Sequence, residues 1–434
     1  MSMHQRRRTL LIAPIALICA SLIFMFLLTL IEPGYYSEMI GERDMMYGNI
    51  TLYAFLALSS IVLLLGSLIA SHLPSLSFPK RKAILSSSLA LYLFAPVVIA
   101  IFLVALTFYK VLHNSPFLIS LLYQNSGSEL KVMFGAAAAN AWTGSFPFAL
   151  GVSWWAWHHL LKYKPALSRG DFIKSQILIT TLIAVIVIAS ALVLSRFIIM
   201  PLIFGLLIVY LKHYLCANWF SYKKMLLIGA VTVVVMLGLF VIAARYRGAD
   251  SSKAIAESAI GYGPASLNRC AAVLNGDFNN ANLSKYLFEQ NFGFISNFPF
   301  LSRFKPNSYL SGQRYQDTIY NATAAANLNQ KFIWVTSYGE IFLEFGQYYL
   351  IYIFFFGFIA GRLWKGFKKE TTSGVILYPW AAFNIAYIFG SNFFASRYLS
   401  VLWILVLLLL IYDLILVPRV ATLPINFRSS GPRI

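Results

Sequence analysis

Long apolar runs separated by short polar loops fill most of the chain. A membrane-spanning helix needs about 17 to 25 apolar residues, so these runs predict an all-α fold, a polytopic transmembrane bundle of about ten spans. The expected spans are residues 9–31, 52–71, 83–109, 132–157, 173–194, 197–211, 225–243, 348–364, 375–391 and 398–417.

The boundary between the fifth and sixth predicted spans depends on a single charged residue. The apolar run 173–211 is too long for one span and long enough for two spans joined by a tight turn. Arg196 lies in its middle, and an arginine is costly in lipid but cheap at a membrane surface. We therefore expect a hairpin that turns at Ser195 and Arg196.

Residues 244–346 form the one long interval without a membrane-length apolar run. Glycine, proline and asparagine divide this interval, and amphipathic helices are expected at 252–260, 264–274 and 323–334. Segment 338–345 has helical spacing and should run into the eighth span, with Gly346 as a kink.

The chain therefore divides into three parts. They are spans one to seven (1–243), a large loop that contains short helices (244–346), and spans eight to ten with a terminal tail (347–434).

The distribution of charge orients the predicted bundle. The chain is 59% hydrophobic and 11% charged, with a net charge of +19. Such a charge suggests nucleic-acid binding in a soluble protein, but alternate loops here hold 20 of the 34 basic residues and three of the 15 acidic ones. Cytoplasmic loops are enriched in Lys and Arg. We therefore expect both termini in the cytoplasm, residues 244–346 on the outer (periplasmic or extracellular) face, and no nucleic-acid partner.

The sequence lacks the motifs of several enzyme classes. The sequence contains no HExxH, DxD-type metal pair, P-loop or GxSxG. Residues 244–346 contain no histidine, and the three cysteines have no metal-ligand spacing. We therefore expect neither a metal nor a cofactor.

The arginines of the outer face are the clearest candidates for binding chemistry. Arginine binds phosphate through a planar, permanently charged fork, and outer basic residues are unexpected under the positive-inside rule. Snorkelling toward lipid headgroups is the alternative explanation. The candidate pyrophosphate ligands are Arg196, Arg245, Arg247, Arg269, Arg314 and Arg397.

A carboxylate could act as a general base toward a sugar hydroxyl, and the candidates are Glu340, Asp250 and Asp317. Glu340 and Glu344 share one helix face. A salt bridge to an outer arginine is the alternative role for Glu340, and Glu344 should be paired or protonated. Tyr246, Tyr315 and Tyr338 are candidate sugar contacts, although interfacial tyrosine belts are common in membrane proteins.

This layout resembles the oligosaccharide repeat-unit polymerases, the O-antigen polymerase family of bacterial inner membranes. The resemblance covers roughly residue 173 to the C-terminus. It rests on Ser195-Arg196, Arg245-Tyr246-Arg247-Gly248, Thr336-Ser337-Tyr338-Gly339-Glu340, Phe345-Gly346, Gly361-Arg362 and Arg397.

The resemblance implies a metal-independent glycosyltransferase of lipopolysaccharide or related polysaccharide biosynthesis. It would polymerise undecaprenyl-pyrophosphate-linked repeat units on the periplasmic face of the inner membrane, beside membrane lipids, a chain-length regulator and a flippase. Two alternatives stay open. An O-antigen ligase is expected to use a histidine in its large outer loop, and a lipid-linked oligosaccharide flippase or other transporter would need charges within the spans.

Overall fold

A computed structural model describes residues 8–74, 89–114, 144–192, 196–217, 220–245, 251–278, 312–394 and 396–416. Every regular element in these ranges is a helix, so the all-α prediction is confirmed there. The helices are α2 (Pro14–Leu28), α3 (Pro33–Ile40), α4 (Ile50–His72), α5 (Leu89–Asn114), α8 (Ser145–Tyr163), α9 (Arg169–Leu192), α10 (Arg196–Cys216), α11 (Tyr222–Arg245), α12 (Ser252–Tyr262), α13 (Pro264–Leu274), α15 (Gly312–Ala325), α16 (Thr336–Phe345), α17 (Tyr349–Lys368), α18 (Thr372–Ala386) and α19 (Arg397–Leu416).

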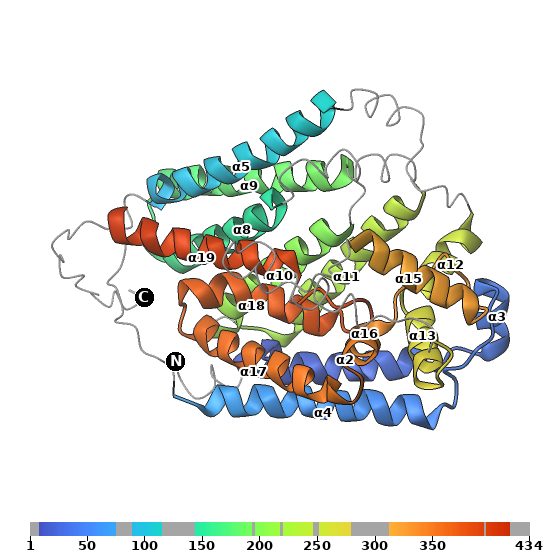
Figure 1. Ribbon diagram of the computed structural model, residues 1–434. Helices are drawn as coiled ribbons and strands as arrows, with labels where there is room; N and C mark the ends of the chain where they lie inside the picture. Colours follow the sequence, from blue (N-terminus) through green and yellow to red (C-terminus); the bar gives the residue numbers. More distant parts are fainter. Residues whose placement is uncertain are drawn as a thin grey trace, which may run out of the picture.

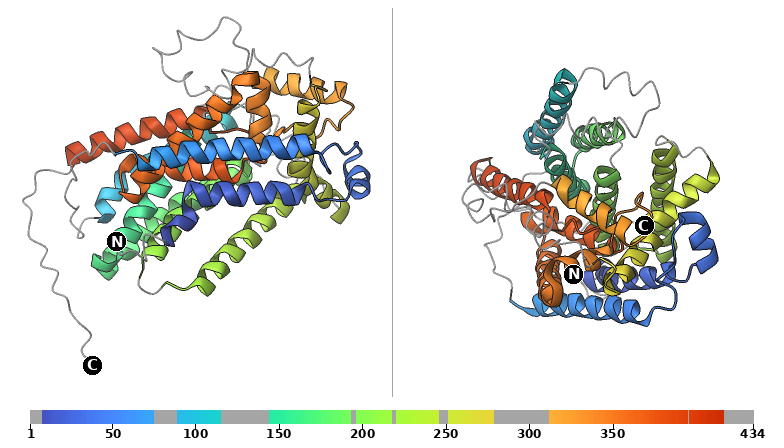
Figure 2. Two further views of the ribbon diagram at one scale, coloured as in Figure 1. Left: turned by 90° about the horizontal axis from the view of Figure 1, so that it is seen from below. Right: turned by 45° about the vertical axis from the view of Figure 1, so that its right-hand side comes forward.

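Long helices form the body of the molecule, and shorter ones cover one end of it (Figure 1). Helices α3, α12, α13 and α15 gather at that end, and we call them the cap layer (Figure 2). Helix α8 lies inside the bundle, where it packs against α5, α9, α10, α18 and α19.

Within the described residues, six helices are long and apolar enough to cross a membrane, so the protein is a multi-pass membrane protein. They are Ile50–His72, Leu89–His113, Arg169–Ser190, Ile198–Cys216, Thr336–Lys368 and Tyr398–Ile415, and a bent α2–α3 pair would make a seventh. Helices α8, α11 and α18 occupy three more predicted positions without being among the six, and α18 has only 15 residues. The count of ten spans stays a prediction.

Two sequence-based boundaries need correction. The predicted first span 9–31 is a short 3-10 turn (Leu10–Ile12) followed by α2, and the chain then bends by 86° into α3. Pro14 and Pro33 begin the two helices, because the fixed φ and missing N–H of proline suit the first turn of a helix. The predicted helix 323–334 is also wrong, since α15 ends at Ala325 and Asn327 has a left-handed φ of 55°.

Helices α4 and α17 approach each other closely because glycines face the contact. A Cβ atom on Gly357 would lie 2.1 Å from the carbonyl oxygen of Leu63, and one on Gly66 would lie 2.2 Å from that of Phe354. Gly357 and Gly361 form a GxxxG pair, the small-residue spacing that lets membrane helices meet backbone to backbone. Near the end of this contact, the guanidinium of Arg362 donates to the carbonyl of Pro74 (2.8 Å).

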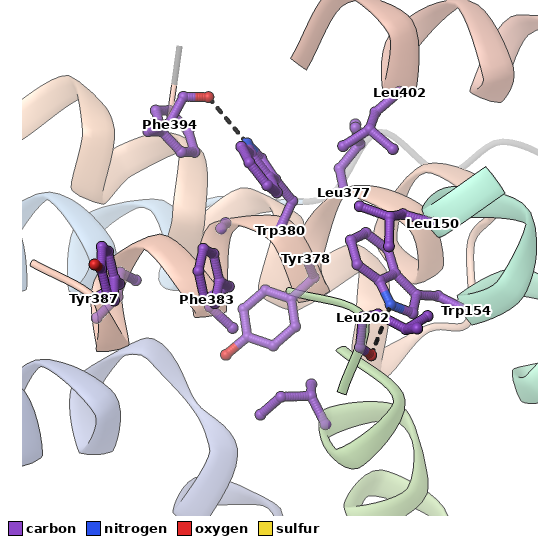
Figure 3. Close-up of a cluster of buried hydrophobic side chains, with 14 of the residues drawn as sticks. Leu150, Trp154, Leu202, Leu377, Tyr378, Trp380, Phe383, Tyr387, Phe394 and Leu402 are labelled. Carbon is purple, nitrogen blue, oxygen red and sulfur yellow. Dashed lines mark hydrogen bonds between the residues drawn. The ribbon is translucent and has the colours of Figure 1, made fainter. Parts of the chain in front are cut away.

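Large aromatic side chains fill the space between α8, α10 and α18 (Figure 3). Trp154 is fully buried, and its indole N–H donates to the carbonyl of Leu202 (3.4 Å). The indole N–H of Trp380 donates to the carbonyl of Phe394 (3.1 Å). The second bond ties α18 to the connection between α18 and α19, which carries polar groups of the candidate site.

Candidate functional site

A buried ion pair joins the cap layer to the loop between α3 and α4. The guanidinium of Arg269 on α13 lies 3.0 Å from the carboxylate of Glu42, and neither side chain is exposed. Arg269 also donates to the carbonyls of Ala265 (2.9 Å) and Asn329 (2.5 Å). The backbone N–H of Asn329 donates to the same carboxylate oxygen of Glu42 (2.7 Å). Three distant segments therefore share one charged centre.

This pairing changes the role expected for Arg269. An arginine that binds pyrophosphate needs donors directed at the ligand, whereas both terminal nitrogens of Arg269 are bound to Glu42 and to carbonyls. Buried charges require such partners, because desolvation of an unpaired ion is costly. We therefore leave Arg269 out of the candidate site and treat it as a residue that holds the cap layer.

Helix α16 begins with an unusual backbone conformation. Thr336 has a φ of +53° and is fully buried, a conformation that is rare and strained for a β-branched residue. The next residue, Ser337, donates its backbone N–H to the carbonyl of Ile388 (2.8 Å). At the other end, Gly346 has a φ of +52° and separates α16 from α17, which confirms the predicted kink. Helix α16 is thus bounded by two left-handed residues.

Glu340 binds the connection between α18 and α19. The hydroxyl of Ser391 lies 2.7 and 2.9 Å from its two carboxylate oxygens, and the backbone N–H of Asn392 donates to one of them (2.7 Å). The amide oxygen of Asn392 accepts from the N–H of Phe394 (3.2 Å). Glu340 therefore fixes a segment that lies 51 residues away in the sequence.

Glu344 lies one helical turn further along α16 and has opposite surroundings. Its side chain is 4% exposed, and neither of its carboxylate oxygens has a hydrogen-bond partner among the described residues. The hydroxyl of Tyr352 is close to the same region, 3.5 Å from the side-chain nitrogen of Asn392. The predicted salt bridge to an arginine is found for neither glutamate within the described part of the chain.

Arg196 and Arg397 are the first residues of α10 and α19. Sixteen residues further along, Lys212 and Asp413 bind partners at the bundle end opposite the cap layer. A helix rises 1.5 Å per residue, so each arginine begins its helix about 24 Å nearer the cap end. The connection that Glu340 binds leads directly to Arg397. Nothing is described of either arginine side chain.

The remaining predicted site residues lie on different elements or outside the described residues. Tyr338 is 1% exposed, and its hydroxyl lies 3.1 Å from that of Ser60 on α4, so it packs inside the bundle. Arg245 is exposed at the last position of α11. Arg314, Tyr315 and Asp317 lie on α15, whose first residues are described by backbone alone. Tyr246, Arg247 and Asp250 lie outside the described residues.

A second polar cluster lies at the end opposite the cap layer. The carboxylate of Glu370 lies 2.9 Å from the ammonium of Lys162 and 3.2 Å from that of Lys212. Burial alone would raise the pKa of Glu370, but the two ammonium groups outweigh it and lower the pKa to about 2. Nearby, ring nitrogens of His158 and His213 lie 3.0 Å apart. This cluster ties α8, α10 and the α17–α18 turn together.

Cysteine and metal chemistry receive no support from the described residues. Cys19, Cys216 and Cys270 form no disulfide with one another, and burial raises the pKa of the Cys270 thiol to about 12. Within the described ranges, no three histidine, cysteine, aspartate or glutamate side chains are placed to share a metal ion.

Comparisons with family models, with curated proteins and with solved structures found no match to this chain. The candidate site is therefore defined by its own geometry.

The sequence pattern does not reveal the contacts of three residues. Ser391 ends the predicted span 375–391 and Asn392 follows it, and two adjacent polar residues before an arginine are a signal for a connection. Glu42 was counted only as an outer acid, because nothing local indicates a partner 227 residues away.

Proposed function

We propose that the protein is a metal-independent membrane glycosyltransferase that polymerises undecaprenyl-pyrophosphate-linked oligosaccharide repeat units. The donor is the growing glycan on its lipid pyrophosphate, and the acceptor is a single lipid-linked unit. The acceptor hydroxyl attacks the anomeric carbon, and the lipid pyrophosphate leaves. Such a reaction needs preorganised cations where the leaving-group charge develops.

One observation carries the proposal. The Thr336–Glu340 segment, which resembles a motif of repeat-unit polymerases, is bound through Glu340 to the connection that leads into Arg397. Residues far apart in the sequence therefore meet at the mouth of a membrane helix. Arg196 begins a second helix that is directed away from the same end. These two arginines are the cations that we assign to the pyrophosphate.

The contacts of Glu340 favour a different role from the general base that the sequence suggested. Both of its carboxylate oxygens already accept hydrogen bonds from Ser391 or Asn392. Glu340 is therefore assigned as a positioning residue that holds Arg397 and its connection in place. Asp250 and Asp317 remain predicted candidates for the general base.

The decisive experiment replaces the two arginines. Arg196→Ala and Arg397→Ala should abolish glycan polymerisation at unchanged protein levels, as observed on gels of surface polysaccharide. Arg43→Ala is the matched control, because Arg43 is an exposed arginine at the cap end that pairs with Asp277. Normal polymer length in both arginine variants would refute the assignment of the pyrophosphate site.

Deletion of the gene separates the proposed function from its alternatives. Core glycan that carries one repeat unit indicates a polymerase, whereas wholly uncapped core indicates a ligase or a flippase. Activity of the purified protein should also persist in EDTA, and a requirement for a divalent cation would contradict the metal-free mechanism.

The transporter alternative also has an observation in its favour. Lys212 and Glu344 are buried ionisable side chains within candidate membrane-spanning helices, and such residues often belong to transport pathways. Movement of lipid-linked glycan across vesicle membranes without any change in glycan length would support this alternative.

A further inference from the structure

Two carboxyl groups on one helix differ in the hydrogen-bond donors that surround them. Glu340 accepts two hydroxyl contacts and one backbone N–H, and these bonds stabilise the ionised form. Glu344 is buried to the same extent and has no such donor among the described residues. An ionised carboxylate without partners in an apolar interior is very costly. Glu344 is therefore neutral in this conformation.

Separated protonation states in neighbouring carboxyl groups are the arrangement by which enzymes assign an acid and a base. The sequence analysis left Glu344 either paired or protonated, and the structure favours the second. A neutral acid protected from water keeps its proton until a substrate group reaches it. The candidate recipient at this end of the bundle is the oxygen that links pyrophosphate to the sugar.

We propose that Glu344 is the general acid of the site and donates its proton to the leaving pyrophosphate, a role that rests on the proposed glycosyl transfer. The acceptor oxygen forms the new bond to the anomeric carbon. The bond from that carbon to the pyrophosphate oxygen breaks, and its electron pair leaves with the oxygen, which takes the proton of Glu344. The acceptor hydroxyl proton passes to water, and water restores the proton of Glu344.

Glu344 lies beside an open corner of the backbone. Gly346, two residues further along, has no atoms within 4 Å of the position where a Cβ would lie, so the corner between α16 and α17 is open. The hydroxyl of Tyr352, which is close to Glu344, lies 3.5 Å from the side-chain nitrogen of Asn392 in the connection that leads to Arg397. Glu344 therefore lies at the same end of the bundle as Arg397.

The protonation state can be tested without any knowledge of the substrate. Dicyclohexylcarbodiimide is an apolar reagent that adds to protonated carboxyl groups and spares ionised ones. The full-length protein in lipid nanodiscs should become labelled at Glu344 and not at Glu340, as read by mass spectrometry of the peptide that contains both. Glu344→Gln should lose the label. Absence of label at Glu344, or equal labelling of Glu340, would overturn the proposal.

Measurements of glycosyltransferase activity test the proposed role of Glu344 as general acid. Glu344→Gln keeps the shape of the neutral acid but cannot donate the same proton. We expect a fall in kcat of about 100-fold or more with little change in KM for the lipid-linked acceptor. Glu257→Gln, a change at the cap-layer acid that pairs with Lys331, is the matched control. Full turnover in Glu344→Gln would overturn the acid assignment, whereas the arginine variants test the glycosyl transfer itself.

Discussion

The carboxylate of Glu42 lies 3.0 Å from the guanidinium of Arg269, and both side chains are withdrawn from solvent. Tyr36 donates its hydroxyl to the same carboxylate, and Asn268 contributes a further donor at 3.1 Å. The cap layer is therefore fixed to the loop between α3 and α4 through a network in which both terminal nitrogens of Arg269 and both oxygens of Glu42 have partners. This fixes α13 and the loop at Asn329, the described parts of the long polar segment that carry these contacts, to the bundle.

Removal of either partner should destabilise the folded protein strongly. In Arg269→Ala the carboxylate of Glu42 stays buried without its counter-charge, a situation that costs about 3–5 kcal/mol. Arg43→Ala is the control, because its ion pair with Asp277 is exposed and such pairs contribute less than about 1 kcal/mol. Thermal unfolding in one detergent measures both variants. Equal melting temperatures for Arg269→Ala and Arg43→Ala would contradict the structural role of the buried pair.

The close contact between α4 and α17 predicts a strong effect of a single methyl group. Gly357→Ala places a Cβ 2.1 Å from the carbonyl oxygen of Leu63, so the helices must separate, at a cost of about 1–3 kcal/mol. Gly229→Ala on α11 meets no atom within 4 Å and should be neutral or stabilising by up to about 1 kcal/mol. Urea or thermal unfolding distinguishes the two, and a tolerated Gly357→Ala would argue against direct backbone packing.

The charge cluster around Glu370 predicts a dependence of stability on pH. Because the folded pKa, about 2, is below the usual value of 4.5, ionised Glu370 stabilises the folded state above pH 4.5. This contribution is lost as the pH falls from 4.5 toward 2. Glu370→Gln should therefore melt below the wild type at pH 7, and the difference should shrink near pH 3. A difference that is independent of pH would show that Glu370 acts through packing alone.

Topology can be checked with a membrane-impermeant maleimide. Cysteine in place of Ser252, at the start of α12 in the cap layer, should react in cells with an intact inner membrane once Cys19 and Cys216 are replaced. Native Cys270 serves as an internal control, because it is fully buried and its thiol pKa is raised to about 12. Labelling only after permeabilisation of the inner membrane would reverse the predicted orientation.

The positions of the helices could be predicted well from the sequence because local patterns determine them. Apolar length located α4, α5, α9, α10, α17 and α19, whereas the turn expected at Ser195 and Arg196 begins outside the described residues. Segment 264–274 was predicted within its true bounds, since Pro264 begins a helix with an amphipathic pattern. The bend after Leu28 was missed because Pro33 falls just beyond an otherwise continuous apolar run.

The site was predicted less completely because its contacts are not local. Composition marked Glu340 and Arg269 as chemical groups but could not say which groups face them. Only tertiary structure shows that Ser391 and Asn392 satisfy Glu340, that Glu42 satisfies Arg269, and that Glu344 has no described partner. The sequence pattern thus predicted which segments carry polar side chains. Tertiary packing determines which of these side chains are already paired and which can act on a substrate.

The ion pair of Glu42 and Arg269 also sets an order for assembly in the cell. Glu42 leaves the ribosome long before its partner, which follows 227 residues later, and the intervening chain contains several membrane helices. The loop after α3 therefore lacks its counter-charge until α13 has been synthesised and has folded. Contacts of such sequence separation form late, so closure of the cap is a final step of biogenesis, and a truncated chain that ends before residue 269 leaves this loop open to quality-control proteases.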